Sequence, residues 1–261
     1  MDNKVNFFAV ILHRTYRLLF SVRGLIAVLM SVYMVVIGAY FLDALMQAGS
    51  VYGELLAIFN ANPDLEFQWF FFDGALSKLI TIFVAPIFIF DAVSGDKSGE
   101  RVGIVLSRPI TRVQYMLIYL ISATLAFAIV LFGALIPGYL IIHPQVPALA
   151  IGPYLATCGL MFLLGFFTLC VALLISTVAR SNLVSFLASF GLFAFLMLPN
   201  ASKYASDALL NAAKATPHYY STYFTTNSFD GGLYAVFALV IILFALPFLA
   251  LAILKFRNED L

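Results

Sequence analysis

Six apolar stretches, each near the length of a membrane-spanning helix, constrain this 261-residue chain more than any other feature of its sequence. A bilayer core about 30 Å thick needs about 20 apolar residues in a helix. The stretches cover roughly residues 24–46, 74–93, 113–142, 151–178, 183–198 and 233–254. They are continuous rather than alternating, which favours helices over a barrel. The sequence therefore predicts an all-α integral membrane protein with six transmembrane helices in a single domain, 1–261.

The composition indicates that lipid is the main solvent of this chain. Hydrophobic residues make up 63% of the sequence and charged residues only 10%, whereas soluble domains carry about 25% charged residues. The net charge is +1 and there is no dense basic stripe, so we expect no nucleic-acid partner. No Cys and His residues have zinc-site spacing, which predicts no metal. Cys158 and Cys170 fall in one stretch, roughly 18 Å apart along a helix, too far for a disulfide.

The basic first segment, 1–23, is expected to form an interfacial helix on the inner membrane surface. His13, Arg14 and Arg17 fall within about 100° of one another at 3.6 residues per turn, and apolar residues cover the rest of the segment. The alternative is a straight continuation of the first span into the cytosol. Basic and apolar residues are interleaved here, unlike in a cleavable signal peptide, so we expect the segment to be retained.

The distribution of positive charge predicts that both termini are cytoplasmic. With that orientation only Lys78, Lys203 and Lys214 of the 14 Lys and Arg residues fall outside. The outer segment 47–73 ends in an aromatic cluster that we interpret as an interfacial anchor. The outer segment 200–231 is expected to form one or two short helices on the outer leaflet or over the bundle.

Few polar groups within the stretches point to chemistry. His143 and His218 fall in outer segments and are interpreted as loop residues without a function, with a catalytic or ligand role as the alternative. Asp91, at the inner end of the second stretch, is expected to pair with Arg14 or Arg17. Small residues such as Gly133 and Gly165 are expected to let helices approach closely.

The segment 94–112, between the second and third stretches, is the place where a soluble partner would meet this chain. It carries basic and acidic residues around an apolar patch at 102–106, and Pro109 is expected to end any helix there. Such a segment can form a short helix with one apolar face and a charged perimeter. The alternative is a solvated inner loop whose charges follow from orientation alone.

The order of residues in this segment resembles the pattern of type-2 ABC transporter permeases. In that pattern an acid ends the second span, a Gly-acid pair follows, and Leu-Ser-x-Pro-Ile-Ser/Thr-Arg comes next. This chain has Asp91, then Gly95-Asp96, then 106–112. It departs from the pattern at 100–102, where Glu-Arg-Val stands in place of the common Gly-Thr-Leu. Weaker matches are the basic start at 14–24, the Leu-x-Ser-x-x-x-Arg-Ser turn at 174–181, the segment after Pro217, and the Phe-Arg-x-x-Asp-Leu tail at 255–261.

The resemblance implies that residues 95–108 form a coupling helix that docks into a cleft on a separate cytoplasmic ATPase. The residues implied in docking are Asp96, Lys97, Glu100, Arg101, Val102, Val105, Leu106 and Arg108. The chain has no Gly-x-x-x-x-Gly-Lys-Ser/Thr loop, so we expect no enzyme activity and no cofactor of its own, with ATP and Mg²⁺ on the partner. A second permease copy, identical or not, would complete the transporter in the lipid bilayer. The resemblance further implies a multi-pass exporter in a prokaryotic plasma membrane, with an undetermined substrate.

Two other classes of function stay open. One is a non-transporting assembly or sensor protein built on the same fold. The other is an intramembrane enzyme or redox subunit, which would need intramembrane His pairs or clustered acids that the apolar stretches lack.

Overall fold

The computed structural model describes residues 7–47, 80–95, 110–144, 150–197, 211, 216–218 and 231–258. Its long helices are α1 (Phe7–Leu19), α2 (Val22–Gln47), α8 (Arg112–Ile142), α9 (Ile151–Val178), α10 (Asn182–Met197) and α13 (Gly231–Arg257). Between α2 and α8, a π-helical turn, η2 (Ile80–Val84), leads into the short α5 (Ala85–Ile87). These ranges contain no strand. The predicted all-α class is therefore confirmed for the part of the chain that the structure describes.

The helices have the length and composition of membrane spans. Arg112–Ile141, Tyr154–Val178 and Gly231–Arg257 are each long and apolar enough to cross a bilayer, with mean hydropathy of 2.4, 2.6 and 3.0. The bent pair Phe7–Leu19 and Val22–Val36 passes the same test if it is one broken span. The described residues thus hold three or four candidate spans, which identifies a membrane protein.

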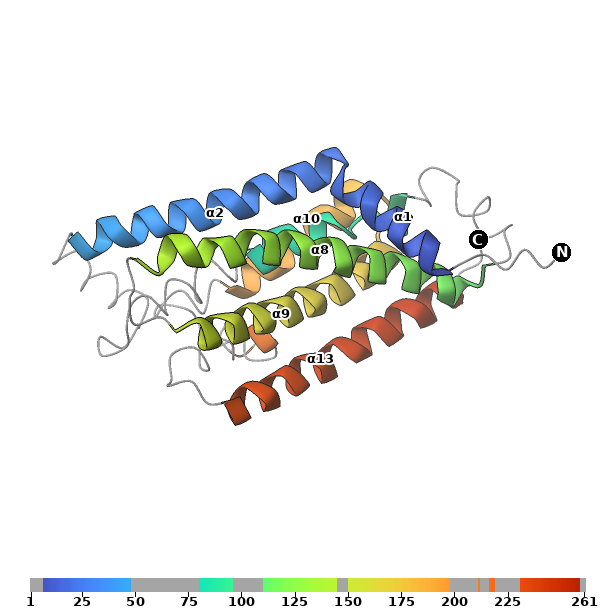
Figure 1. The fold of residues 1–261 in the computed structure, drawn as a ribbon. Coiled ribbons are helices and arrows are strands. Elements are labelled where there is room, and N and C mark those ends of the chain that lie inside the picture. Colours follow the sequence, from blue (N-terminus) through green and yellow to red (C-terminus); the bar gives the residue numbers. More distant parts are fainter. Residues whose placement is uncertain are drawn as a thin grey trace.

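The bundle is organised around the α8–α9 pair. Figure 1 shows α2 on one side of this pair and α13 on the other, in keeping with the contacts of α2 with α8 and of α13 with α9. Hydrophobic side chains from α8, α9, α13 and residues 80–93 form the core between them. The start of α8 and the end of α13 meet at the right of Figure 1, and α1 lies at that side as well.

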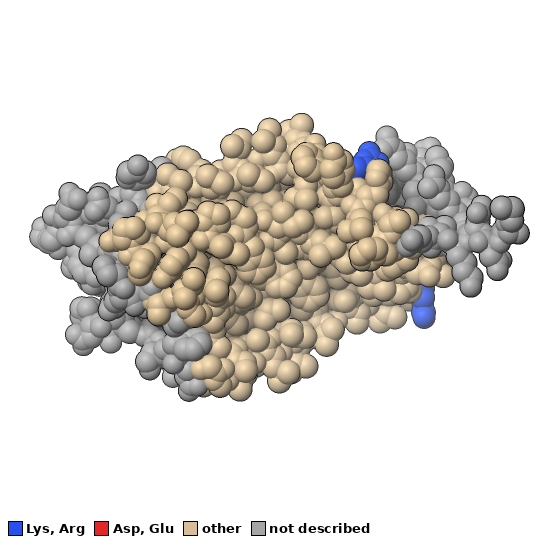
Figure 2. All heavy atoms as spheres, viewed as in Figure 1, with Lys and Arg blue, Asp and Glu red and all other residues tan. Residues whose placement is uncertain are grey.

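Positive charge gathers toward that same end, which we call the basic end. Its members are the Lys and Arg residues of the described ranges, namely Arg14, Arg17, Arg23, Arg112, Arg180, Lys255 and Arg257. Each belongs to α1 or lies at the start or end of a longer helix. Among the coloured residues on the face shown in Figure 2, blue is confined to this end. The asymmetry that the sequence predicted therefore appears in the fold as one charged end of an apolar bundle.

The second apolar stretch differs from the continuous helix that the sequence predicted. Pro86 has no N–H to donate to the carbonyl four residues earlier, so the helical hydrogen-bond pattern is interrupted there. The π-helical turn η2 ends two residues before it. Beyond α5 the chain forms turns from Phe88 to Val93, with the amide of Phe88 bonded to Ala85 O at 3.2 Å and that of Ala92 to Ile89 O at 2.9 Å. Non-helical backbone therefore lies in the protein interior, where it needs partners from other elements.

A sharp elbow separates α1 from α2. The two helix axes differ by 64°, which excludes the straight continuation considered as the alternative. The hydroxyl of Ser21 accepts a hydrogen bond from the Gly24 amide at 3.2 Å and so caps the first turn of α2. A Cβ at Gly24 would lie 2.1 Å from the carbonyl oxygen of Leu19, so the elbow requires glycine there.

Helix α1 packs on the bundle along one side only. Its Ile11 and Thr15 are buried, whereas Phe8 and Tyr16 are exposed. The hydroxyl of Ser122 on α8 donates to Ile11 O at 3.2 Å, which fixes α1 along α8. One side of α1 is thus bound to the bundle, and the opposite side presents aromatic residues outward.

The two glycines expected at close helix contacts behave differently. A Cβ at Gly165 on α9 would lie 2.1 Å from the ring of Phe127 on α8, so the ring occupies the space that a side chain would take. The prediction is confirmed for Gly165. At Gly133 on α8 no atom lies within 4 Å of an added Cβ, so this glycine adjoins open space.

Replacement of Gly24 by alanine tests the elbow. The new Cβ meets backbone oxygens that cannot move aside independently, so we expect Gly24→Ala to lower the free energy of unfolding by about 1–3 kcal/mol. The matched control is Gly152→Ala in the first turn of α9, where nothing lies within 4 Å. Because alanine favours helix over glycine, the control should be neutral or more stable by up to about 1 kcal/mol. Thermal unfolding in detergent measures both, and equal effects would contradict the crowded elbow.

Candidate functional site

A cluster of polar side chains joins residues 91–95 to the end of α9 and the start of α10. We call it the polar junction, and its members are Arg23, Asp91, Ser94, Ser176, Asn182 and Ser185. It lies toward the basic end and adjoins the predicted docking segment, 95–108. Because it is the described polar cluster next to that segment, it is the candidate functional site.

The central group of the polar junction is the hydroxyl of Ser176. It accepts hydrogen bonds from the amides of Val93 at 3.0 Å and Ser94 at 3.2 Å. All three residues are buried. A buried N–H without a partner costs about 1–3 kcal/mol of stability. The Ser176 hydroxyl therefore removes this cost for two backbone amides.

The carbonyl groups of the same turn accept hydrogen bonds from side chains of α8 and α10 and from Ser94. The Phe90 carbonyl accepts from Ser185 Oγ on α10 at 2.5 Å, and Ser94 Oγ lies 3.0 Å from it. The Ala92 carbonyl accepts from the Tyr115 hydroxyl on α8 at 2.9 Å. The turn at 88–93 is therefore held by α8, α9 and α10 together.

Asn182 connects this turn to the beginning of α10. Its Oδ1 lies 2.9 Å from Ser94 Oγ. Asn182 is also the first residue of α10, so this contact fixes where α10 begins relative to the turn. The short Ala179–Ser181 connection between α9 and α10 is consequently held on both sides.

Asp91 forms its ion pair with a residue that the sequence did not predict. Its Oδ2 lies 2.6 Å from Nη1 of Arg23, and the two side chains are 23% and 38% exposed. The predicted partners were Arg14 or Arg17, and both lie on α1 rather than in the first turn of α2. The elbow carries Arg23 to Asp91, while the Arg14 guanidinium stands 3.2 Å from the centre of the Tyr119 ring.

The residues that follow the predicted docking segment are also held by hydrogen bonds. Thr111 caps α8 through a reciprocal pair of hydrogen bonds with Gln114, at 3.2 and 2.9 Å. Nη1 of Arg112 donates to the carbonyl of Arg257 at 2.8 Å, at the last turn of α13. These bonds satisfy exposed groups at two helix ends and tie α8 to α13.

The predicted docking residues themselves lie outside the described residues. They are Asp96, Lys97, Glu100, Arg101, Val102, Val105, Leu106 and Arg108. The structure describes Gly95, where the predicted segment begins, and resumes at Ile110, two residues after its end.

His218, which the sequence places in an outer loop, is buried. It is 3% exposed, its ring lies 5.7 Å from that of Phe167 and 5.5 Å from that of Phe193, and Nε2 is 3.5 Å from Thr168 Oγ1. The neighbouring Thr216 and Pro217 are also buried. The sequence placed segment 200–231 on the outer leaflet or over the bundle, and residues 216–218 are buried, with His218 against α9 and α10. His143, by contrast, is exposed beside Tyr139 just after α8.

Within the described ranges, no three His, Cys, Asp or Glu side chains gather as a metal site requires. Cys158 and Cys170 are both buried and unbonded to each other. The sequence matches no model of a known protein family, and no curated protein resembles it significantly.

Removal of the Ser176 hydroxyl tests the centre of the polar junction. Ser176→Ala leaves the buried amides of Val93 and Ser94 without their acceptor. We therefore expect the free energy of unfolding to fall by about 1–3 kcal/mol for each unpaired amide. Ser31→Ala is the matched control, because the equally buried Ser31 hydroxyl donates only to Ala27 O within its own helix. Thermal unfolding should separate the two variants clearly, and a control as damaging as Ser176→Ala would refute the assignment.

A charge exchange tests the ion pair. Arg23→Asp places two carboxylates together and should lower the unfolding midpoint, and adding Asp91→Arg should restore it. The matched control combines Asp91→Arg with Arg17→Asp, a pair that the structure does not bring together. Recovery in the control but not in the Arg23 exchange would favour the partner first predicted from the sequence. The expected effect is modest, about 0.2–1 kcal/mol, because both side chains are partly exposed.

Proposed function

We propose that this chain is the transmembrane subunit of an ATP-driven ABC transporter, an exporter whose energy comes from a separate ATPase. The observation that supports this proposal is the meeting of the segments that resemble permeases. Asp91 pairs with Arg23 of the basic start, Ser94 adjoins the 174–181 turn through Ser176, and Arg112 adjoins the tail at Arg257. Segments far apart in the sequence share one end of the bundle, on either side of the proposed coupling helix.

The anchoring of both ends suits a segment that transmits force. A docked helix can move the membrane domain only if the connections between the two do not give way when the helix moves. Hydrogen bonds from α8, α9 and α10 hold the turn before the segment. The N-cap of α8 and its link to α13 hold the turn after it. Movement of residues 95–108 would therefore displace several helices together.

The docking face proposed from the sequence has the chemistry of a protein interface. The apolar patch at 102–106 supplies contact area, and the charges around it set orientation. ATP and Mg²⁺ would be bound by the ATPase, and a second permease copy would face this one across the transport path.

The orientation that we propose places the basic end in the cytoplasm. Loops rich in Lys and Arg remain on the cytoplasmic side during insertion. With six crossings, both termini and residues 94–112 then face the compartment that holds ATP. We assign the protein on this basis to the plasma membrane of a prokaryote.

A charge in the apolar patch tests the docking proposal. Val105→Asp would bury a carboxylate against the ATPase, so we expect at least tenfold less ATPase to be retained by the tagged chain from membranes that contain both. Val105→Ile, which keeps the apolar surface, is the matched control and should retain the ATPase. Normal retention and transport by Val105→Asp would reject the coupling helix.

Labelling of the segment tests the orientation. A single cysteine at Ser98, with Cys158 and Cys170 replaced by alanine, should resist a membrane-impermeant maleimide in intact cells and react after the cells are opened. Reaction in intact cells would place the segment outside and end the proposal.

A further inference from the structure

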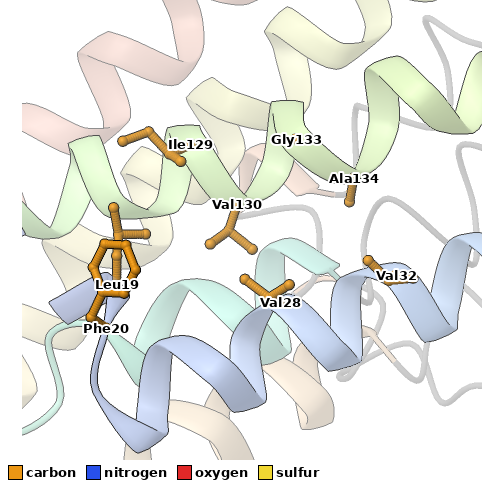
Figure 3. A pocket seen from close by; sticks show the side chains of 8 residues that line it. All are labelled: Leu19, Phe20, Val28, Val32, Ile129, Val130, Gly133 and Ala134. Carbon is orange, nitrogen blue, oxygen red and sulfur yellow. The ribbon is translucent and has the colours of Figure 1, made fainter. Parts of the chain in front are cut away.

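An apolar groove opens between the α1–α2 elbow and α8. It has a volume of about 310 Å³, and Figure 3 shows side chains from both sides of it. Its lining is Leu19, Phe20, Val28, Val32, Ile129, Val130, Gly133 and Ala134. Every one of these residues is apolar, so the groove suits a hydrocarbon occupant and offers no hydrogen-bonding side chain.

The elbow and one glycine create the groove. The 64° bend between α1 and α2 leaves a gap between the first turns of α2 and α8. At Gly133 the space that a side chain would fill is open. Farther along, a Cβ at Gly138 would lie 2.7 Å from Val35, so α2 and α8 touch there and close the groove.

Positive charge borders the end of the groove that lies nearest α1. His13 and Arg17 are exposed on α1. At 3.6 residues per turn, Arg17 lies about 60° and His13 about 20° from Phe20 around the helix, so all three share one side. Neither basic residue has an ion pair within the part of the chain that the structure describes.

The groove is long enough for part of an acyl chain. Its lining advances about 6 Å along α2, from Val28 to Val32, and about 7.5 Å along α8, from Ile129 to Ala134. Leu19 and Phe20 line its end toward α1. A chain that enters from that end leaves its headgroup on the side of α1, which carries Arg17 and His13.

We propose that this groove binds one acyl chain of an anionic phospholipid, whose phosphate is bound by Arg17 and His13. Guanidinium and phosphate form strong charge-assisted hydrogen bonds, and anionic lipids attract basic residues at the cytoplasmic surface. A chain bound there lies between the α1–α2 elbow and α8. The inference needs only membrane residence, so it stands or falls separately from the proposed transport function.

Lipid retention by the full-length protein tests the chain site. The protein is purified in mild detergent with dioleoyl phosphatidylglycerol, and bound lipid is counted by native mass spectrometry. Gly133→Leu should fill the groove and reduce retained lipid at least fivefold. Gly191→Leu, at an exposed glycine on α10 that also has open space, is the matched control and should retain lipid. Val28→Phe fills the same groove from α2 and should reproduce the loss.

The headgroup is tested with a lipid of the same acyl chains. Wild-type protein should retain phosphatidylglycerol at least fivefold better than dioleoyl phosphatidylcholine, and His13→Gln with Arg17→Gln should abolish that preference. Excess inorganic phosphate should not displace the lipid, because the chain provides most of the contact. Undiminished retention in both groove-filling variants overturns the proposal, as does equal binding of the two lipids by the wild type. A change of oligomeric state with unchanged lipid would identify the groove as a contact between copies and overturn it as well.

Discussion

The constraint on which this structure depends is that backbone groups inside a membrane protein must find partners within the protein. The long helices satisfy it internally. The turn at 88–93 satisfies it only in part, because the amide of Val93 and the carbonyls of Phe90 and Ala92 bond to side chains of other helices. The Ser176 hydroxyl, the Tyr115 hydroxyl and Ser185 supply the missing partners from three different helices. One interrupted helix thereby fixes the positions of α8, α9 and α10 at the basic end.

The sequence predicted the long helices well because their signal is local. Each apolar run ends where charged residues or turn residues begin, so α9 was predicted at its observed bounds, Ile151–Val178, and α13 within a few residues. The break after Pro86 was not predicted. Hydrophobicity is the same in a helix and in a buried turn, and only the side chains of other elements show that the turn can be accommodated.

The sequence predicted Asp91 as a member of the site but not the residue that pairs with it. Asp91 was singled out correctly, but Arg23 rather than Arg14 or Arg17 binds it, because the partner depends on the angle of the elbow. His218 was missed for a related reason. It follows Thr216 and Pro217 in a segment whose sequence resembles a surface loop, and its contacts with Phe167 and Thr168 are set by tertiary packing. A signal existed only in Thr168, a polar residue within an otherwise apolar run.

The residues that carry the permease resemblance have physical roles that do not involve a partner. Thr111 caps a helix, Ser176 binds two amides, and Arg112 binds the end of α13. Such residues hold the chain on either side of the segment, whereas the docking face that we propose consists of Val102, Val105 and their neighbours. A permease and a non-transporting relative would need the same anchors, since both must satisfy the same backbone groups. The distinction between them therefore lies in the apolar patch, and a variant there separates the two functions while a variant in the polar junction tests only the fold.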